Sequence, residues 1–249
     1  MSLDPFHIPS HVPGFDALVA GYEAASEATR AKLRSLLNVP YGEGPDEKLD
    51  LFFAEEAHGG SRPIHLFIHG GYWRAQSKDR YAFVADEVTA AGAIAAIIDY
   101  SLMPRARMAT LVGQAPRRAL ARRARRDIRR RREGAEHGGR SAGGHLASYL
   151  FSRGPREADG APLVRSALLT SGLYDLVPLA NSFLQREVRF TEIAPWSPVA
   201  SRPSAGVAVT LITAGAETAP FHEQMSAYPT CCAAQARAWR WRRPRARTT

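Results

Sequence analysis

The sequence predicts an α/β fold with a mostly parallel sheet and helices on both faces. Short apolar runs at 64–68 and 94–98 flank the amphipathic stretch 79–93. Strand, helix and strand in this order indicate a right-handed βαβ unit. Two further apolar runs, at 167–171 and 207–213, each lead into a turn or loop. Near-continuous apolar runs of this length are typical of parallel strands that are buried on both faces.

The other elements follow from local patterns. Residues 14–37 have apolar positions at helical spacing and predict one helix, and Leu49–Phe53 alternate as a short strand. A helix is expected to begin near Thr110, but its pattern fails after Gln114. Two more helices are predicted, one directly after Ser141 and one that begins at residue 219.

Size and composition fit one domain that spans residues 1–249 and contains no disulfide framework. The chain has no apolar run near the roughly 20 residues of a membrane span, and its N-terminal residues lack the pattern of a secretory signal. Cys231 and Cys232 are adjacent and imply no metal site. We expect a cytoplasmic protein without a membrane partner.

The net charge of +9 is concentrated in two arginine-rich segments. Residues 115–140 carry a net +8 and residues 229–249 a net +6, which leaves −5 for the rest of the chain. Ten arginines in residues 117–132 would attract phosphates, but no aromatic residues alternate with them and no nucleic-acid-binding motif is present. We therefore expect no nucleic-acid partner.

Gly139, Ser141 and Gly143 have the Gly-x-Ser-x-Gly spacing of a serine nucleophile. In such a site the serine occupies a sharp strand-to-helix turn, and small flanking residues allow the backbone and the substrate to approach closely. The backbone N–H of Ala142, at the start of the following helix, could then face a developing oxyanion. Alone, this short motif is weak, because it also arises by chance.

A second motif, His69-Gly70-Gly71-Tyr72-Trp73, directly follows the apolar run 64–68. It fits a tight turn, and it equally fits an oxyanion loop in which the N–H groups of Gly70 and Gly71 face a substrate carbonyl. The two motifs, one βα unit apart in the expected order, indicate a hydrolase site more strongly than either motif alone.

Glu217 is the candidate catalytic acid. In an α/β hydrolase the chain order is nucleophile, acid and then histidine, and Glu217 comes just after the predicted strand 207–213. Asp175, which follows the preceding strand, is the second candidate. Either carboxylate could also be an ordinary solvated loop residue.

The blocks FIHGGYWRAQSKDRYAFVADEVTAAG, IDYSLMP, SAGGHLA and AGAETAPFHEQ resemble bacterial kynurenine formamidases, which have the α/β-hydrolase fold. The resemblance spans roughly 14–114 and 141–228. It implies a serine hydrolase that cleaves N-formyl-L-kynurenine to formate and kynurenine without a metal or organic cofactor. By position it makes Ser141 the nucleophile and Glu217 the acid. It implies that the oxyanion donors are Gly70, Gly71 and Ala142, and that the substrate pocket includes His69, Tyr72 and Trp73.

The sequence departs from this family in two places. The residues before Ser141, REGAEHGGR, lack an apolar strand and carry Arg140 where a histidine is usual, so we expect the central strand to be disrupted. No histidine follows His222, so the C-terminal strand and the catalytic histidine are expected to be missing and the activity to be impaired. We hypothesise that 115–140 and 229–249 are out-of-frame translations, which sequencing of the coding DNA tests.

Other functions stay open at this stage. A general carboxylesterase of the same fold would use the same nucleophile and oxyanion donors. An inactive pseudo-hydrolase that only binds a ligand would fit the missing histidine. In either enzyme the partner is a small-molecule substrate, such as N-formylkynurenine or an aryl ester or amide, and a homodimer is an open option for the assembly.

Overall fold

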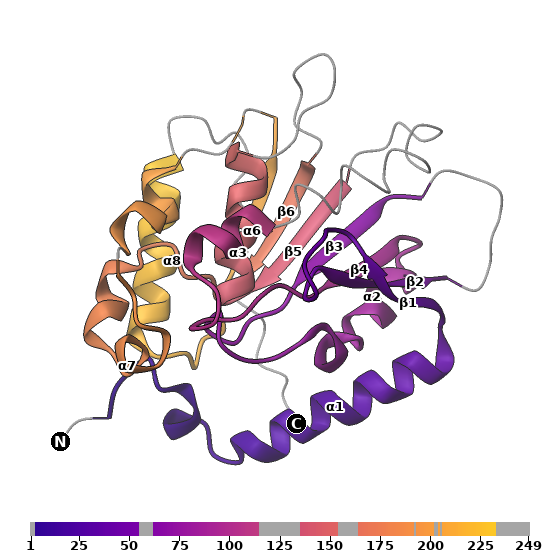
Figure 1. Ribbon diagram of the computed structural model, residues 1–249, viewed down its shortest axis with the longest axis horizontal. Helices are drawn as coiled ribbons and strands as arrows, with labels where there is room; N and C mark the ends of the chain where they lie inside the picture. The colour runs from indigo at the N-terminus through magenta and orange to yellow at the C-terminus, as the bar shows by residue number, and fades with distance from the viewer. Residues whose placement is uncertain are drawn as a thin grey trace.

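Seven strands form one sheet in the order β1-β2-β4-β3-β5-β6-β7 (Figure 1). This computed structural model describes residues 3–54, 62–114, 135–153, 164–191, 193–201, 204 and 206–232. The strands are β1 Arg34–Pro40, β2 Lys48–Phe53, β3 Ile64–Ile68, β4 Ile94–Ile98, β5 Ala135–Arg140, β6 Val164–Thr170 and β7 Ala208–Ile212. The α-helices are α1 Phe15–Lys32, α2 Val84–Ala90, α3 Met108–Gln114, α6 Ala142–Arg153, α7 Leu184–Val188 and α8 Ala219–Cys232. The 3-10 helices are η1 Ile8–His11, η2 Lys78–Tyr81, η4 Val177–Asn181, η5 Ala194–Trp196 and η6 Pro198–Ala200.

The sheet is mostly parallel. β1 and β2 pair antiparallel, as do β2 and β4, while β4, β3, β5, β6 and β7 all run parallel. Because the carboxyl ends of the parallel strands lie along one edge of the sheet, the loops that follow β3, β5, β6 and β7 can converge there. Open α/β sheets place their ligand sites along this edge.

Helices cover both faces of the sheet, as the sequence predicts. Alternating residues of β4 enter two different cores: Ala95 and Ile97 pack with η2 and α2, while Ala96 and Ile98 join the larger core that includes α6. Figure 1 shows α1 and α2 on one face and α3, α6 and α8 on the other. The predicted α/β class with a mostly parallel sheet is confirmed.

One predicted helix is shorter in the structure than in the sequence-based interpretation. We expected a helix over 14–37, but α1 ends at Lys32 and residues 34–40 form the edge strand β1, which pairs with β2. Leu36 and Leu37 fit a helical spacing but are 49% and 46% exposed in this strand. Pairing with β2 therefore outweighs the local helical pattern.

The expected disruption of the central strand is wrong. Residues 135–140 form β5, which pairs in parallel with β3 on one side and β6 on the other. Parallel pairing uses only main-chain groups, so it does not require the apolar side chains whose absence led to our expectation. Arg140 is half-buried and is not an isolated charge. Its guanidinium donates a hydrogen bond to the Tyr22 hydroxyl at 3.3 Å and lies 5.7 Å from the centre of the Tyr22 ring.

The structure describes only part of each arginine-rich segment, namely residues 135–140 of the first and 229–232 of the second. Residues 115–134 and 233–249 lie outside the described residues, and so does the expected loss of a C-terminal strand. The first residues of the second segment belong to α8, which continues through Cys232. In the part of the chain that is described, no helix combines the length and the apolar character that a membrane crossing needs.

A buried ion pair anchors the segment that follows β3. The Lys78 ammonium, in η2, lies 3.1 Å from a carboxylate oxygen of Asp50 in β2, and the two side chains are 3% and 1% exposed. Asp50 also accepts a hydrogen bond from the backbone N–H of Asn38 at 2.7 Å, and Lys78 contacts Asp79 at 2.7 Å. The pair therefore connects η2 to the antiparallel part of the sheet.

We expect Lys78→Met to lower the free energy of unfolding by about 3–5 kcal/mol, because it leaves the Asp50 carboxylate buried without its counter-ion. Urea denaturation followed by circular dichroism measures this loss. Lys32→Met is the matched control: Lys32 pairs with Asp86 at 3.3 Å, but the two side chains are 64% and 40% exposed. That variant should lose less than about 1 kcal/mol. Equal losses in the two variants would show that the Asp50–Lys78 pair does not stabilise the fold.

Candidate active site

Ser141 occupies the sharp turn between β5 and α6. Its φ of 54° is in the left-handed region, which non-glycine residues adopt at a cost in backbone energy. Two backbone hydrogen bonds hold this conformation: the Ser141 N–H donates to the Thr170 carbonyl at 2.8 Å, and the Ser141 carbonyl accepts from the His145 N–H at 3.2 Å. The serine is thus fixed at the carboxyl end of the central strand, where a nucleophile of this type is expected.

The two glycines of the motif are required by close packing. A Cβ atom on Gly139 would lie 2.5 Å from the Gly143 carbonyl oxygen, and one on Gly143 would overlap the carbonyl oxygen of Ile68 in β3. Both distances are shorter than the contacts that real Cβ atoms make with neighbouring atoms. The Gly-x-Ser-x-Gly spacing is therefore a steric condition for the turn to pack against β3.

The Gly-Gly loop after β3 lies directly against Ser141. A Cβ atom on Gly70 would lie 2.9 Å from the Arg140 carbonyl oxygen and 3.2 Å from the Ser141 Cβ. Gly71, Tyr72 and Trp73 all have positive φ, at 104°, 51° and 58°. This run of left-handed residues makes the loop turn back sharply beside the serine, which is how an oxyanion loop must be placed.

His69 holds the start of this loop in the core. Its side chain is fully buried and stacks on the Tyr100 ring, with centroids 4.5 Å apart. The Tyr100 hydroxyl donates to the His69 carbonyl at 3.1 Å, and the His69 Nε2 lies 3.5 Å from an Asp99 carboxylate oxygen. Its contacts give His69 a packing role in the structure.

Trp73 and His145 form a buried polar chain behind the loop. The Trp73 indole N–H donates to His145 Nδ1 at 3.2 Å, and His145 Nε2–H donates to the Trp196 carbonyl at 2.9 Å. These two bonds use both ring nitrogens and fit the neutral imidazole with its proton on Nε2. Burial lowers the pKa of His145 to about 4. His145 is therefore a neutral structural group one helical turn from Ser141.

Glu217 lies in the loop between β7 and α8. Its carboxylate accepts hydrogen bonds from the hydroxyls of Ser171 and Thr213, the latter at 2.5 Å. Ser171 follows Thr170, whose carbonyl binds the Ser141 N–H, and the Ser171 N–H donates to the Ile212 carbonyl of β7 at 2.7 Å. The carboxylate is thus fixed at the same edge of the sheet as Ser141.

Asp175, the second acid candidate, and His222, the histidine that follows Glu217 in the sequence, have other hydrogen-bond partners. The Asp175 carboxylate accepts from the Val177 N–H at 3.0 Å, at the start of η4. His222, in the first turn of α8, donates from Nε2 to the main-chain carbonyl of Glu217 at 3.1 Å, not to its carboxylate. The hydrogen bonds described for the Glu217 carboxylate come from hydroxyl groups.

The structure also brings to the site residues that the sequence reasoning missed. Ser171 and Thr213 orient Glu217, and they directly follow the parallel strands β6 and β7, which is the signal that could have identified them. The N-terminal segment is a further contributor: the Phe6 carbonyl accepts from the Tyr72 hydroxyl at 2.6 Å, and the Pro5 carbonyl accepts from the Thr218 hydroxyl at 2.8 Å. This segment therefore connects the Gly-Gly loop to the loop that carries Glu217.

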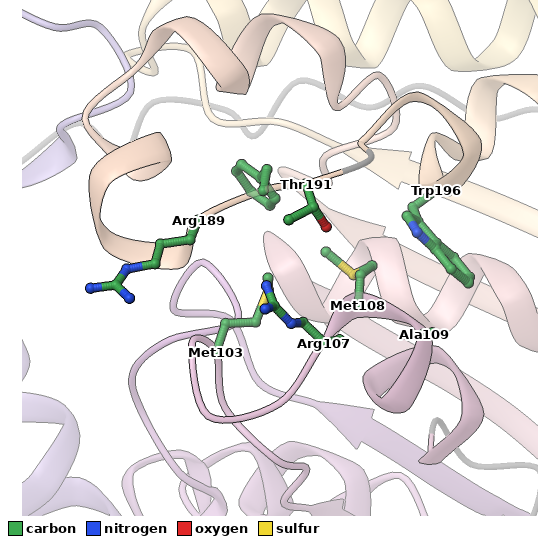
Figure 2. Close-up of a pocket in the computed structure, with 8 residues that line it drawn as sticks. Met103, Arg107, Met108, Ala109, Arg189, Thr191 and Trp196 are labelled. Atoms are coloured by element: carbon green, nitrogen blue, oxygen red, sulfur yellow. The ribbon is translucent and has the colours of Figure 1, made fainter.

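One cavity among the described residues, between the segment before α3 and the segment after α7, is lined by residues other than His69, Tyr72 and Trp73 (Figure 2). Trp73 and His69 are buried in the core, and Tyr72 is half-buried with its hydroxyl on Phe6. The substrate-pocket roles of these three residues stay a prediction. Within the described ranges, no group of three or more His, Cys, Asp or Glu residues could hold a metal ion.

We expect Gly143→Ala to reduce the free energy of unfolding by about 1–3 kcal/mol, because the added methyl group overlaps the Ile68 carbonyl. Gly21→Ala is the control: Gly21 lies inside α1 with nothing within 4 Å of an added Cβ, so this variant should gain about 0.5–1 kcal/mol. Thermal and urea unfolding of both variants measure the difference. A stable Gly143→Ala variant would show that the turn has room to relax.

We expect the stability to fall as the pH falls from about 6.5 to about 4, in part because of His145. In the unfolded chain the imidazole takes up a proton near pH 6.5, while in the folded chain burial delays this to about pH 4. Relative to His145→Gln, the native chain should lose about 3 kcal/mol over this interval. Urea denaturation at a series of pH values measures both profiles, and parallel profiles would contradict the pKa of the buried imidazole.

The chain is similar to known kynurenine formamidases in sequence. It is 29% identical to the zebrafish (Danio rerio) kynurenine formamidase over 221 residues, which cover 85% of this chain and 73% of the relative. It is 31% identical to the salmon (Salmo salar) kynurenine formamidase over 176 residues, or 70% of this chain and 58% of the relative. The chain thus spans less than two thirds of the salmon protein. No protein-family model matches the chain.

Solved structures support the fold. A candidate thioesterase from Silicibacter sp. TM1040 superposes with a TM-score of 0.80 at 27% identity, covering 96% of this chain and 90% of that one. Esterase B from Lactobacillus rhamnosis superposes with a TM-score of 0.68 at 16% identity, covering 91% of this chain and 82% of that one. With the parallel sheet and the strand–serine–helix turn, these likenesses identify the chain as an α/β-hydrolase-fold protein homologous to the kynurenine formamidases.

Proposed function

We propose that this chain is a serine hydrolase of the kynurenine formamidase type. The observation that carries the proposal is the position of Ser141, held at a φ of 54° at the end of the central strand with the Gly70 loop packed against it. The proposed substrate is N-formyl-L-kynurenine, and the products are formate and kynurenine. Ser141 is the proposed nucleophile, Glu217 the proposed acid, and the backbone N–H groups of Gly70, Gly71 and Ala142 the proposed oxyanion donors.

In the proposed reaction the Ser141 Oγ attacks the formyl carbon and its proton passes to a base. The carbonyl oxygen becomes an oxyanion, which the backbone N–H groups stabilise more strongly than the ground-state carbonyl. Collapse of this intermediate breaks the C–N bond, and the leaving arylamine takes up a proton. Water then attacks the formyl-serine ester, which releases formate and restores the hydroxyl group.

The base is the part of this mechanism that departs from the family. A histidine oriented by the acid would normally relay the proton. Here the Glu217 carboxylate is hydrogen-bonded to Ser171 and Thr213, and His145 uses both ring nitrogens in the core. The sequence contains no histidine after His222. We therefore propose that the nucleophile and its loop are present but that turnover is impaired by several orders of magnitude.

A general carboxylesterase is the second candidate, favoured by the likeness to solved esterases such as those from Lactobacillus rhamnosis and Pyrobaculum calidifontis. The two activities share the nucleophile and the oxyanion donors and differ in the leaving group. Rates on N-formylkynurenine and on phenyl acetate, measured under the same conditions, distinguish them: a formamidase prefers the formamide, and a carboxylesterase prefers the ester.

We expect added imidazole to raise the rate of N-formylkynurenine hydrolysis by about tenfold or more, because it supplies the general base that this chain does not place on Glu217. The absorbance of the released kynurenine measures the rate. Ser141→Ala is the matched control, since it removes only the nucleophilic oxygen and corrects for direct attack by imidazole.

If imidazole raises the rate equally in the native chain and in Ser141→Ala, Ser141 is not the nucleophile. If the native chain turns over rapidly without imidazole, and Ser141→Ala does not, the nucleophile is supported but the proposed impairment is wrong. If neither substrate is cleaved under any of these conditions, the chain is a pseudo-hydrolase.

A further inference from the structure

The N-terminal residues Asp4-Pro5-Phe6-His7 form a tight turn beside the candidate active site. The His7 N–H donates to the Asp4 carbonyl at 2.9 Å, and the Asp4 Oδ1 atom accepts from the Phe6 N–H at 2.9 Å. Aspartate at the first position and proline at the second are residues that a β-turn favours. The sequence therefore specifies this turn locally, without help from the rest of the chain.

The turn binds two loops of the site through consecutive carbonyl groups. The hydrogen bond that closes a β-turn does not use the carbonyls of its two central residues. The Pro5 carbonyl accepts from the hydroxyl of Thr218, the residue after Glu217, at 2.8 Å. The Phe6 carbonyl accepts from the Tyr72 hydroxyl of the Gly-Gly loop at 2.6 Å. Two adjacent carbonyls thus connect the loop that follows β7 to the loop that follows β3.

The Asp4 side chain attaches the turn to a third loop. Its second carboxylate oxygen, Oδ2, accepts from the Phe183 N–H at 2.6 Å, where the segment after β6 enters α7. The Phe183 ring packs edge-on against the rings of His7 and Tyr72, with centroids 5.0 and 5.8 Å apart. Figure 1 shows the N-terminal segment in indigo beside α7 and α8. One carboxylate therefore shapes the turn with one oxygen and docks it with the other.

The turn gives the Gly-Gly loop a fixed point in the core. Phe6 is 5% exposed, and its ring lies 6.3 Å from the Phe221 ring of α8. Tyr72 is the middle residue of the left-handed run 71–73, a conformation that persists only where the surroundings hold it. The hydrogen bond from its hydroxyl to the Phe6 carbonyl is one of the contacts that hold it.

We propose that Asp4 is a positioning residue for the reaction at Ser141, and that the turn 4–7 is a clasp that keeps the Gly-Gly loop and the Glu217 loop in register. This inference rests on the proposed function. Asp4 acts through the Pro5 and Phe6 carbonyls rather than on the substrate. Small displacements of an oxyanion donor weaken the stabilisation of the transition state, so release of the clasp lowers kcat more than it raises KM.

The first test is hydrogen–deuterium exchange of the full chain, followed by mass spectrometry. In Asp4→Ala we expect residues 70–76 and 213–219 to exchange about tenfold faster, because a hydrogen-bonded carboxylate is lost, while β3 and β6 keep their native rates. Tyr72→Phe, which removes only the hydroxyl on Phe6, should affect residues 70–76 alone. Ser10→Ala is the matched control: Ser10 is exposed, and its described side-chain hydrogen bond, to His7 at 2.6 Å, stays within the segment. It should exchange as the native chain does.

The second test is the kcat and KM of N-formylkynurenine hydrolysis with imidazole added. Asp4→Ala should lower kcat about tenfold and change KM by less than about twofold. Asp4→Asn, which keeps one acceptor oxygen, should have an intermediate kcat, and Ser10→Ala a native one. Tyr72→Phe should also lower kcat. When it is combined with Asp4→Ala, the loss should be smaller than the sum of the two separate effects, because both substitutions release the same clasp.

An equal rise of exchange throughout the sheet in Asp4→Ala would overturn the proposal, since Asp4 would then only stabilise the fold. Unchanged exchange in the two loops, or fully additive losses of kcat, would also overturn it. The exchange measurement needs no chemistry, so it tests the clasp even in a chain that does not turn over. A failure of the proposed hydrolase function would appear as the absence of Ser141-dependent turnover with imidazole and leave the exchange pattern unaltered. A failure of the clasp would leave the Ser141 dependence intact.

Discussion

The candidate site depends on the contact between the turn at Ser141 and the end of β3. A side chain at Gly143 would overlap the Ile68 carbonyl, and one at Gly139 would press on the Gly143 carbonyl, so the turn can reach this position only with glycine at both places. This contact determines where α6 begins. It also brings the Gly70 loop, which leaves β3 at Ile68, to within van der Waals distance of the serine. The nucleophile and the loop are therefore placed by one packing constraint rather than by two.

Two polar networks extend from this contact along the carboxyl edge of the sheet. On one side the Trp73 indole, the His145 imidazole and the Trp196 carbonyl connect the Gly-Gly loop to the segment after α7. On the other side Thr170 binds the Ser141 N–H while its neighbour Ser171 binds Glu217. Because buried polar groups are costly without partners, both networks fix the orientation of the loops that they join. The N-terminal segment at Pro5 and Phe6 then links the Gly-Gly loop to the Glu217 loop.

The distribution of charge gives the site its chemical character. The Glu217 carboxylate accepts its described hydrogen bonds from the hydroxyls of Ser171 and Thr213, while the charged residues described in the lining of the cavity between α3 and α7 are Arg107 and Arg189.

The sequence by itself determined the parallel α/β order, the bounds of β3, and the serine and glycine positions of both motifs. These features depend on local patterns: short apolar runs, helical spacing, and glycine where the backbone must turn or approach closely. Tertiary structure decided the rest. Residues 34–40 became an edge strand because β2 offered main-chain partners, and 135–140 became the central strand because parallel pairing needs no particular side chain and Tyr22 receives Arg140. The engagement of His145 in the core and the hydroxyl partners of Glu217 likewise depend on residues distant in sequence, whose proximity no local pattern encodes.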